Sequence, residues 1–182
     1  MPAWNRWYHV TGSTYGTWLR GDPRGWRARH HREHVEGDYR TPPPAGTHAA
    51  QLAISRASLK RDPVRLTHEA RRIACDTMVE ALRFHDCDVS AIAVGATHFH
   101  IVAQFPDHNP RKLVGIAKKR SARALSERAL VEAGGVWAIR SRAGIINDEA
   151  HLRTATRYVL RHEGQGAATC SGVNPNIPEH KR

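Results

Sequence analysis

Residues 89–105 read VSAIAVGATHFHIVAQF, and this stretch decides the fold class. Val89–Val94 is a short apolar run typical of a buried strand, and His98–Phe105 alternates as a strand with two unlike faces does. Gly95-Ala96-Thr97 between them has the composition of a turn. The stretch therefore predicts a β-hairpin.

The second strand of this hairpin places two histidines on one face. Successive side chains of a strand point to opposite sides, so an apolar face is formed by Phe99, Ile101, Ala103 and Phe105. His98 and His100 lie on the other face, where two neighbouring imidazoles can share a divalent ion. Two solvent-exposed histidines are the alternative interpretation, because His-x-His alone is not specific to metal sites.

Periodic segments on either side predict the remaining elements. They are a strand at Trp7–Tyr15, helices at Thr67–His85 and Pro110–Ala133, a strand at Trp137–Ile146, and a last helix from Asp148 to about Glu163. The order β, α, β, β, α, β is the split βαβ, ferredoxin-like pattern. We therefore predict an α+β fold, with an antiparallel sheet, two helices on one face and a C-terminal helix that carries Tyr158.

The first strand and the first helix are separated by a long segment. Residues 16–66 contain Gly21, Pro23 and Pro42-Pro43-Pro44, which interrupt regular structure, so we predict a long irregular insertion. Gly164 suits the left-handed position that ends the last helix. The predicted organisation is one domain at 1–166 and a flexible tail at 167–182.

Composition limits the function. The 182 residues suffice for one domain, and 28 Lys and Arg against 17 Asp and Glu give a formal charge of +11. That charge fits a nucleic-acid-binding protein, although membrane-surface and ordinary basic proteins share it. Three widely spaced cysteines make a disulfide framework improbable and favour a reducing compartment. No apolar run approaches the roughly 20 residues of a membrane span, so we expect a cytoplasmic, nucleoid-associated protein without membrane contact.

The last predicted helix carries a tyrosine beside a further histidine. Tyr158 and His162 are four residues apart and so share a helical face, roughly 5–6 Å apart at Cβ. A tyrosine hydroxyl is a weak nucleophile at its ordinary pKa of about 10. It can attack a phosphodiester whose phosphorus a bound divalent metal has made more electrophilic. The alternative is an amphipathic tyrosine that packs at the edge of the core.

The joint pattern resembles a known family. A strand bearing His-hydrophobic-His, then a basic region, then a helix bearing one tyrosine, is similar to the HUH endonuclease superfamily. Within it the chain resembles the single-tyrosine transposases of small insertion sequences and their REP-associated relatives. Trp7-Tyr8-His9-Val10-Thr11 is similar to their first strand. The resemblance extends over roughly 4–166.

The resemblance implies a metal site, a nucleophile and a reaction. It maps two metal ligands onto His98 and His100, a third onto His162, and the nucleophile onto Tyr158. Members of the family use a divalent ion, usually magnesium or manganese, and form a 5′-phosphotyrosine intermediate. Many of them have Gln or Asn at the third ligand position. Three imidazoles would instead favour a softer ion, manganese or zinc.

The resemblance also implies a partner, single-stranded DNA folded into a hairpin. We expect contacts to backbone phosphates from Lys118, Lys119, Arg120, Arg140 and Arg142. Arg20 and Arg24, beside Trp18 and Trp26, suit stacking and phosphate binding in single strands, unless these tryptophans pack into the core. Some relatives are dimers that exchange tyrosine helices, so a monomer and a homodimer both stay open.

Two other functions fit part of the sequence. A catalytically idle or domesticated nucleic-acid-binding regulator would keep the fold, but it would not need the complete set of three histidines and Tyr158. A cupin-like metalloenzyme would use the His-x-His pair, but the three helical periods argue against its all-β architecture. The sequence therefore favours the tyrosine nuclease.

Overall fold

The computed structural model describes residues 4–27, 34–35, 44, 46–132 and 134–172. Parts of the predicted insertion and tail, at 28–33, 36–43, 45 and 173–182, lie outside the described residues. The strands are β1 (Trp7–Thr14), β2 (Trp26–Arg27), β3 (His34–Val35), β4 (Asp88–Val94), β5 (His98–Gln104), β6 (Trp137–Ile145) and β7 (Ala168–Ser171). The helices are α1 (Ala49–Ala57), α2 (His68–Phe84), α3 (Pro110–Glu127) and α4 (Glu149–Leu160), with 3-10 turns η1 (Trp4–Arg6) and η2 (Arg161–Gln165).

Five strands form one antiparallel sheet in the order β6-β1-β5-β4-β7. Its first four strands have the order of the split βαβ, ferredoxin-like pattern, and β7 adds an edge beside β4. The α+β fold predicted from the sequence is therefore confirmed. The strand that carries the two histidines, β5, lies at the centre of this sheet.

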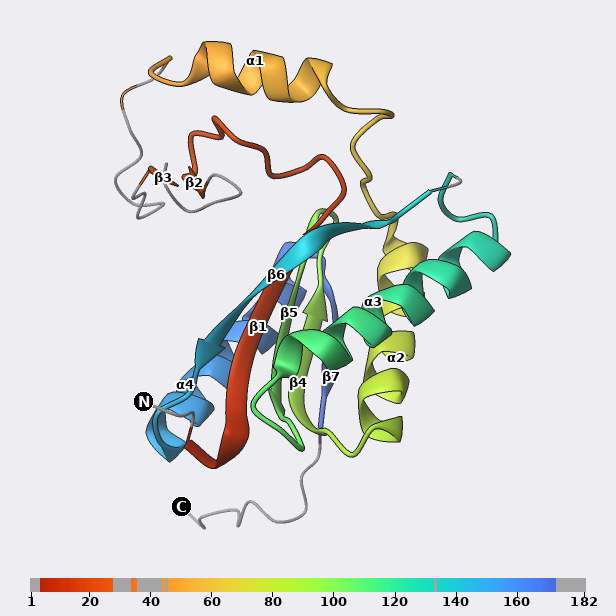
Figure 1. The fold of residues 1–182 in the computed structure, drawn as a ribbon. Coiled ribbons are helices and arrows are strands. Elements are labelled where there is room, and N and C mark those ends of the chain that lie inside the picture. The colour runs from red at the N-terminus through yellow and green to blue at the C-terminus, as the bar shows by residue number, and fades with distance from the viewer. Residues whose placement is uncertain (1–3, 28–33, 36–43, 45, 133, 173–182) are drawn as a thin grey trace.

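Helices cover both faces of the sheet, as Figure 1 shows. α2 and α3 pack on one face over a core that includes Phe99, Ile101 and Ala103 of β5. α4 packs on the other face against a smaller core that includes Val102. The cupin-like alternative is thereby excluded. None of the helices in the described part of the chain combines the length and apolar character that a membrane crossing requires.

A side-chain cap starts one helix on each face of the sheet. The Thr67 side chain accepts a hydrogen bond of 3.2 Å from the Ala70 amide and starts α2. The Asp148 side chain accepts one of 2.7 Å from the His151 amide and starts α4. Leu152, Ala155 and Val159 of α4 are buried against the sheet, so the spacing of apolar residues determines which way Tyr158 points.

A glycine allows the sheet to pack closely around β5. A Cβ atom on Gly12 would lie 2.5 Å from the ring of Phe99, which is fully buried. Gly12 pairs with Phe99 on β5, and the β1–β6 register shifts between Gly12 and Thr14. The small residue thus lets a large core side chain sit against the central strand pair.

The structure differs from the sequence prediction at four places. The 16–66 segment, expected to be irregular, contains α1, because AAQLAISRA after the prolines is rich in helix-forming residues. α3 ends at Glu127 rather than Ala133, and Ala129 adopts a φ of 53°. The left-handed residue after α4 and η2 is Gly166, not Gly164. Within the segment expected to be a tail, β7 pairs with the open edge of β4.

Candidate functional site

Three histidines from two elements converge on the α4 face of the sheet. His98 and His100 project from β5, and His162 comes from the η2 turn that continues α4. Their possible ligand nitrogens all lie within 4.8 Å of one another. The ring centroids are 5.1 Å apart for His98–His100, 5.7 Å for His98–His162 and 4.4 Å for His100–His162. This histidine triad could hold a divalent metal ion.

The backbone orients His162. Its Nδ1 lies 3.0 Å from the carbonyl oxygen of Tyr158 and 3.2 Å from that of Val159, so this nitrogen donates and carries the proton. The Nε2 lone pair is then the one available to a ligand. His162 is only 7% exposed, and the buried backbone bonds hold its ring in one orientation.

A fourth histidine, His9 on β1, contacts the triad. Its Nε2 lies 3.0 Å from Nδ1 of His100, and the two rings stack with centroids 5.3 Å apart. When His100 Nδ1 carries the proton and donates to His9, the Nε2 of His100 is free to bind a metal. Sequence reasoning missed His9. Its position on the predicted strand Trp7–Tyr15 showed which residues share its side of that strand, but not which strand lies beside it. The pairing of β1 with β5 was needed to place it beside His100.

Burial favours the neutral form of His9, His98 and His100. Removal from water is the main cause that lowers the pKa of His100 to about 2, and its interactions with His162, His9 and His98 contribute the rest. Burial likewise lowers the pKa of His9 to about 4, with contributions from His151 and His162. The pKa of His98 is lowered by burial and then by the charges of His162 and Arg24. Neutral imidazole is the metal-binding form, so these residues do not need to lose a proton near neutral pH.

Tyr158 lies at the open side of the triad. Its ring centroid is 4.9 Å from that of His162 and 5.5 Å from that of His100, and the side chain is 47% exposed. His9 lies slightly farther, at 5.9 Å. The phenol is therefore accessible to a large substrate and still adjoins the potential ligands. The shared face of Tyr158 and His162 agrees with their four-residue spacing.

Some of the expected DNA-contacting residues meet between α3 and β6. Lys118, Arg140 and Arg142 line a pocket of about 610 Å³ together with Arg111. Lys118 Nζ donates to the carbonyl oxygens of Ala138 at 2.6 Å and Ile139 at 3.1 Å, and burial lowers its pKa. Lys118 thus ties α3 to β6. Arg142 pairs with Thr11, which pairs with His100, so Arg142 shares the face of the triad.

The other expected contacts lie elsewhere. The guanidinium of Arg120 lies over the ring of Phe84 on α2, 4.9 Å from its centroid, and Lys119 is exposed on α3. The adjacent residues 118–120 therefore do not form one surface. Arg20 and Arg24 lie in the insertion, over Trp26 at 5.1 Å and Trp18 at 4.5 Å respectively. Trp7, by contrast, is buried in the core.

The donor set fits a divalent ion. Three neutral imidazoles are typical ligands of zinc, manganese and other transition metals. All three have one ring nitrogen engaged: His162 by the backbone, His100 by His9, and His98 by Thr97 Oγ1 at 3.4 Å. Such outer hydrogen bonds accompany most histidine–metal sites because they fix the tautomer and ring orientation.

Comparisons with known proteins add a likeness of fold. No protein-family model matches the sequence, and neither does any curated protein. Among solved structures, the chain is similar to a REP-associated tyrosine transposase bound to a REP hairpin. The two share 11% sequence identity, with 91% of this chain and 70% of the other covered and a TM-score of 0.49. A likeness at this level carries no inference about activity.

Proposed function

We propose that the protein is a metal-dependent single-stranded DNA endonuclease and strand transferase that acts through Tyr158. One observation carries the proposal. A half-exposed tyrosine adjoins a partly buried set of three histidines, with ring centroids 4.9 Å from His162 and 5.5 Å from His100. A tyrosine that packs at the edge of the core would not require this ligand set beside it.

The chemistry follows from that arrangement. A divalent ion at the triad would draw electron density from a phosphate oxygen and make the phosphorus easier to attack. Tyr158 Oη then forms a bond to phosphorus while the bond to the 3′-oxygen breaks, leaving a 5′-phosphotyrosine and, after protonation, a 3′-hydroxyl. Attack by another 3′-hydroxyl reverses the exchange and joins the new strand. His98, His100 and His162 would hold the ion, and the ion would keep the reacting phosphate near the phenol.

The geometry favours action within one chain. Tyr158 and the three histidines belong to the same chain and are already adjacent. A homodimer that exchanges tyrosine helices is not needed to complete the site. We therefore propose that Tyr158 acts in cis, with manganese or zinc favoured over magnesium by the three imidazoles.

The substrate is proposed from charge and from the HUH resemblance. A formal charge of +11 suits a polyanion, and Arg142 lies on the face of the sheet that carries the triad. The exposed tyrosine can reach a backbone phosphate, and the HUH resemblance implies that this phosphate belongs to single-stranded DNA. We further propose that the DNA is folded into a hairpin and that the reaction is a transposase-like strand exchange.

A covalent-adduct assay tests the proposal. The metal-loaded protein is incubated with labelled single-stranded DNA hairpins and run on a denaturing gel. We expect a shifted band that requires metal and disappears in Tyr158→Phe. Tyr8→Phe is the matched control, because Tyr8 is buried in the core on the opposite face and should leave the band unchanged.

Two outcomes would contradict the proposal. A band of equal strength in Tyr158→Phe would show that another residue is the nucleophile. Tight hairpin binding by the wild-type protein with no covalent band in any metal would favour the idle nucleic-acid-binding protein.

A further inference from the structure

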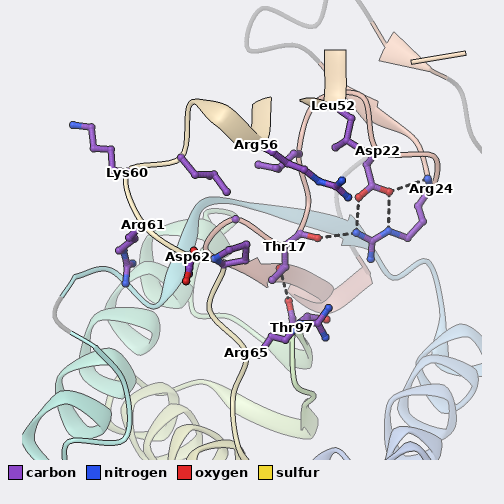
Figure 2. A pocket seen from close by; sticks show the side chains of 14 residues that line it. Thr17, Asp22, Arg24, Leu52, Arg56, Lys60, Arg61, Asp62, Arg65 and Thr97 are labelled. Atoms are coloured by element: carbon purple, nitrogen blue, oxygen red, sulfur yellow. Dashed lines mark hydrogen bonds and ion pairs between the residues drawn. The ribbon is translucent and has the colours of Figure 1, made fainter. Parts of the chain in front are cut away.

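The 16–66 insertion builds a second cavity at one end of the sheet. This pocket has a volume of about 760 Å³, within the range of ligand sites. Its walls come from residues 16–24, from α1 and from residues 59–65, and Thr97 closes it on the side of the sheet. Figure 2 shows these walls from close by. The elements predicted from the sequence did not indicate this cavity.

The lining is strongly cationic. Five basic residues, Arg24, Arg56, Lys60, Arg61 and Arg65, face two acidic ones, Asp22 and Asp62. Asp22 is already engaged by Arg24, whose Nη2 lies 2.6 Å from its carboxylate. Within the part of the chain that the structure describes, Arg56 and Arg65 lie within ion-pair distance of no carboxylate, although the charge of Arg56 helps to lower the pKa of Asp22. The pocket therefore holds an excess of positive charge.

Arg56 and Arg65 lie at different parts of the pocket. In Figure 2 the Arg56 side chain extends toward the Asp22–Arg24 pair, and Arg65 lies at the side of Thr97. Lys60 extends away from them in the same view. A ligand with more than one negative group, spaced along its length, would satisfy both arginines better than a single small anion.

The pocket ends one residue before the triad in the chain. Thr97 lines the pocket, and the next residue is His98 of the triad. Thr17 Oγ1 donates to the Thr97 carbonyl at 3.2 Å and ties the insertion to the beginning of β5. Two of the lining arginines lie over aromatic rings, Arg24 over Trp18 at 4.5 Å and Arg61 over Tyr15 at 4.4 Å.

We infer that this pocket binds backbone phosphates of the single strand whose reacting phosphate lies at the histidine triad. Arg56 and Arg65 are the phosphate contacts, and Thr97 marks where the strand passes from the pocket to His98. The inference rests on the proposed function, since it assigns a subsite to the same DNA. It gives the insertion a role that the sheet and its helices do not provide.

Salt-dependent binding tests the inference. Binding of a short fluorescein-labelled poly-dT strand to the full chain is followed by anisotropy over a range of salt concentrations. Each lost phosphate contact in single strands reduces the slope of log affinity against log salt by about 0.7. We expect Arg56→Ala with Arg65→Ala to reduce it by about 1.4. Arg83→Ala with Arg128→Ala, which removes the same charge from α2 and the end of α3, should leave it unchanged.

A charge-conserving pair separates binding from folding. Arg56→Lys with Arg65→Lys should keep the wild-type slope, and the melting temperatures of all variants should agree. A wild-type slope in the double alanine variant, or an equal loss in the control pair, would overturn the inference. If that variant also keeps the covalent Tyr158 adduct, the proposed function stands without this subsite. If the wild-type protein forms no covalent adduct and does not bind poly-dT, the proposed function and this inference are both wrong.

Discussion

The histidine triad and the insertion pocket are built in opposite ways. α4, which leads to the triad, buries Leu152, Ala155 and Val159 against the sheet. α1, all of whose residues the structure describes, buries none, and its Ile54 is 62% exposed. It is attached instead by Ser55 Oγ, which donates to the Arg20 carbonyl at 2.9 Å, and by the close approach of its backbone to Gly21.

This difference separates precise placement from electrostatic attraction. A metal site and a nucleophile need fixed geometry, which tightly packed apolar contacts supply. Phosphate attraction tolerates movement, because charge acts over several ångströms. Segments with few buried apolar contacts also open at lower cost than the core. We therefore expect the insertion to rearrange at lower cost than the triad.

The largest expected effect is on metal binding by the triad. His98→Ala with His100→Ala should reduce metal affinity by more than about 100-fold, the upper end of what an outer hydrogen-bond partner is worth. Titration calorimetry with manganese and zinc measures it. His68→Ala with His85→Ala, at the two ends of α2, should change nothing. Stoichiometric metal in the triad variant would point to another site, such as Cys75, Asp76 and Cys170.

Substitution of one isoleucine in the sheet and one in α1 compares how tightly the core and the insertion are packed. Ile92 of β4 is fully buried, so Ile92→Ala should lower the free energy of unfolding by about 2–5 kcal/mol. Ile54→Ala on α1 should change it by no more than about 0.5 kcal/mol. Urea denaturation gives both values. A large loss from Ile54→Ala would mean that α1 is part of the core, and the contrast drawn above would be wrong.

His9 should have a smaller effect than the ligands. His9→Ala removes the hydrogen bond to His100 Nδ1 and should weaken metal binding about 10–100-fold. His9→Gln, whose side-chain oxygen can accept the same bond, should recover part of the loss. An equal effect of both changes would indicate that His9 acts by filling space rather than by orienting His100.

As pH falls, protonation linked to His9 and His100 should lower the stability before protonation in the insertion does. The folded-state pKa values of His9 and His100 lie below the ordinary 6.5, so the unfolded chain takes up protons first as pH falls. Their contribution to the stability of the metal-free protein is thus fully present above pH 6.5 and is lost as pH falls, down to about pH 4 for His9 and about pH 2 for His100. The loss is about 1.4 kcal/mol per pH unit for each such histidine.

The insertion should respond only at lower pH. Burial by itself would raise the pKa of Asp22, but hydrogen bonds and charge from Arg24 outweigh it, and the pKa falls below 3.8. The stability from this pair is present above pH 3.8 and is lost as pH falls further. Chemical denaturation of metal-free protein across this range measures both windows. A flat profile between pH 6.5 and 4, or the same slope in His9→Gln, would contradict the assignment to His9 and His100.

Sequence reasoning succeeded where a short repeat carried the information. The alternation in residues 89–105 and the helical periods predicted β4, β5, α2 and α4 to within a residue or a few, because apolar spacing reports which face is buried. It failed at α1 and β7, since short elements that bury little have almost no periodic signal. The run 118–120 was read as one surface, although α3 turns Lys118 toward β6 and Arg120 toward Phe84.

By itself the sequence determined the fold class and the elements that carry His98, His100, Tyr158 and His162, because local spacing and burial fix strands and helices. Only the tertiary structure decided what lies beside them. The pairing of β1 with β5 brought His9 to His100, and folding of the insertion against Thr97 made the cationic pocket. Both depend on contacts between residues far apart in the chain, which no local pattern records.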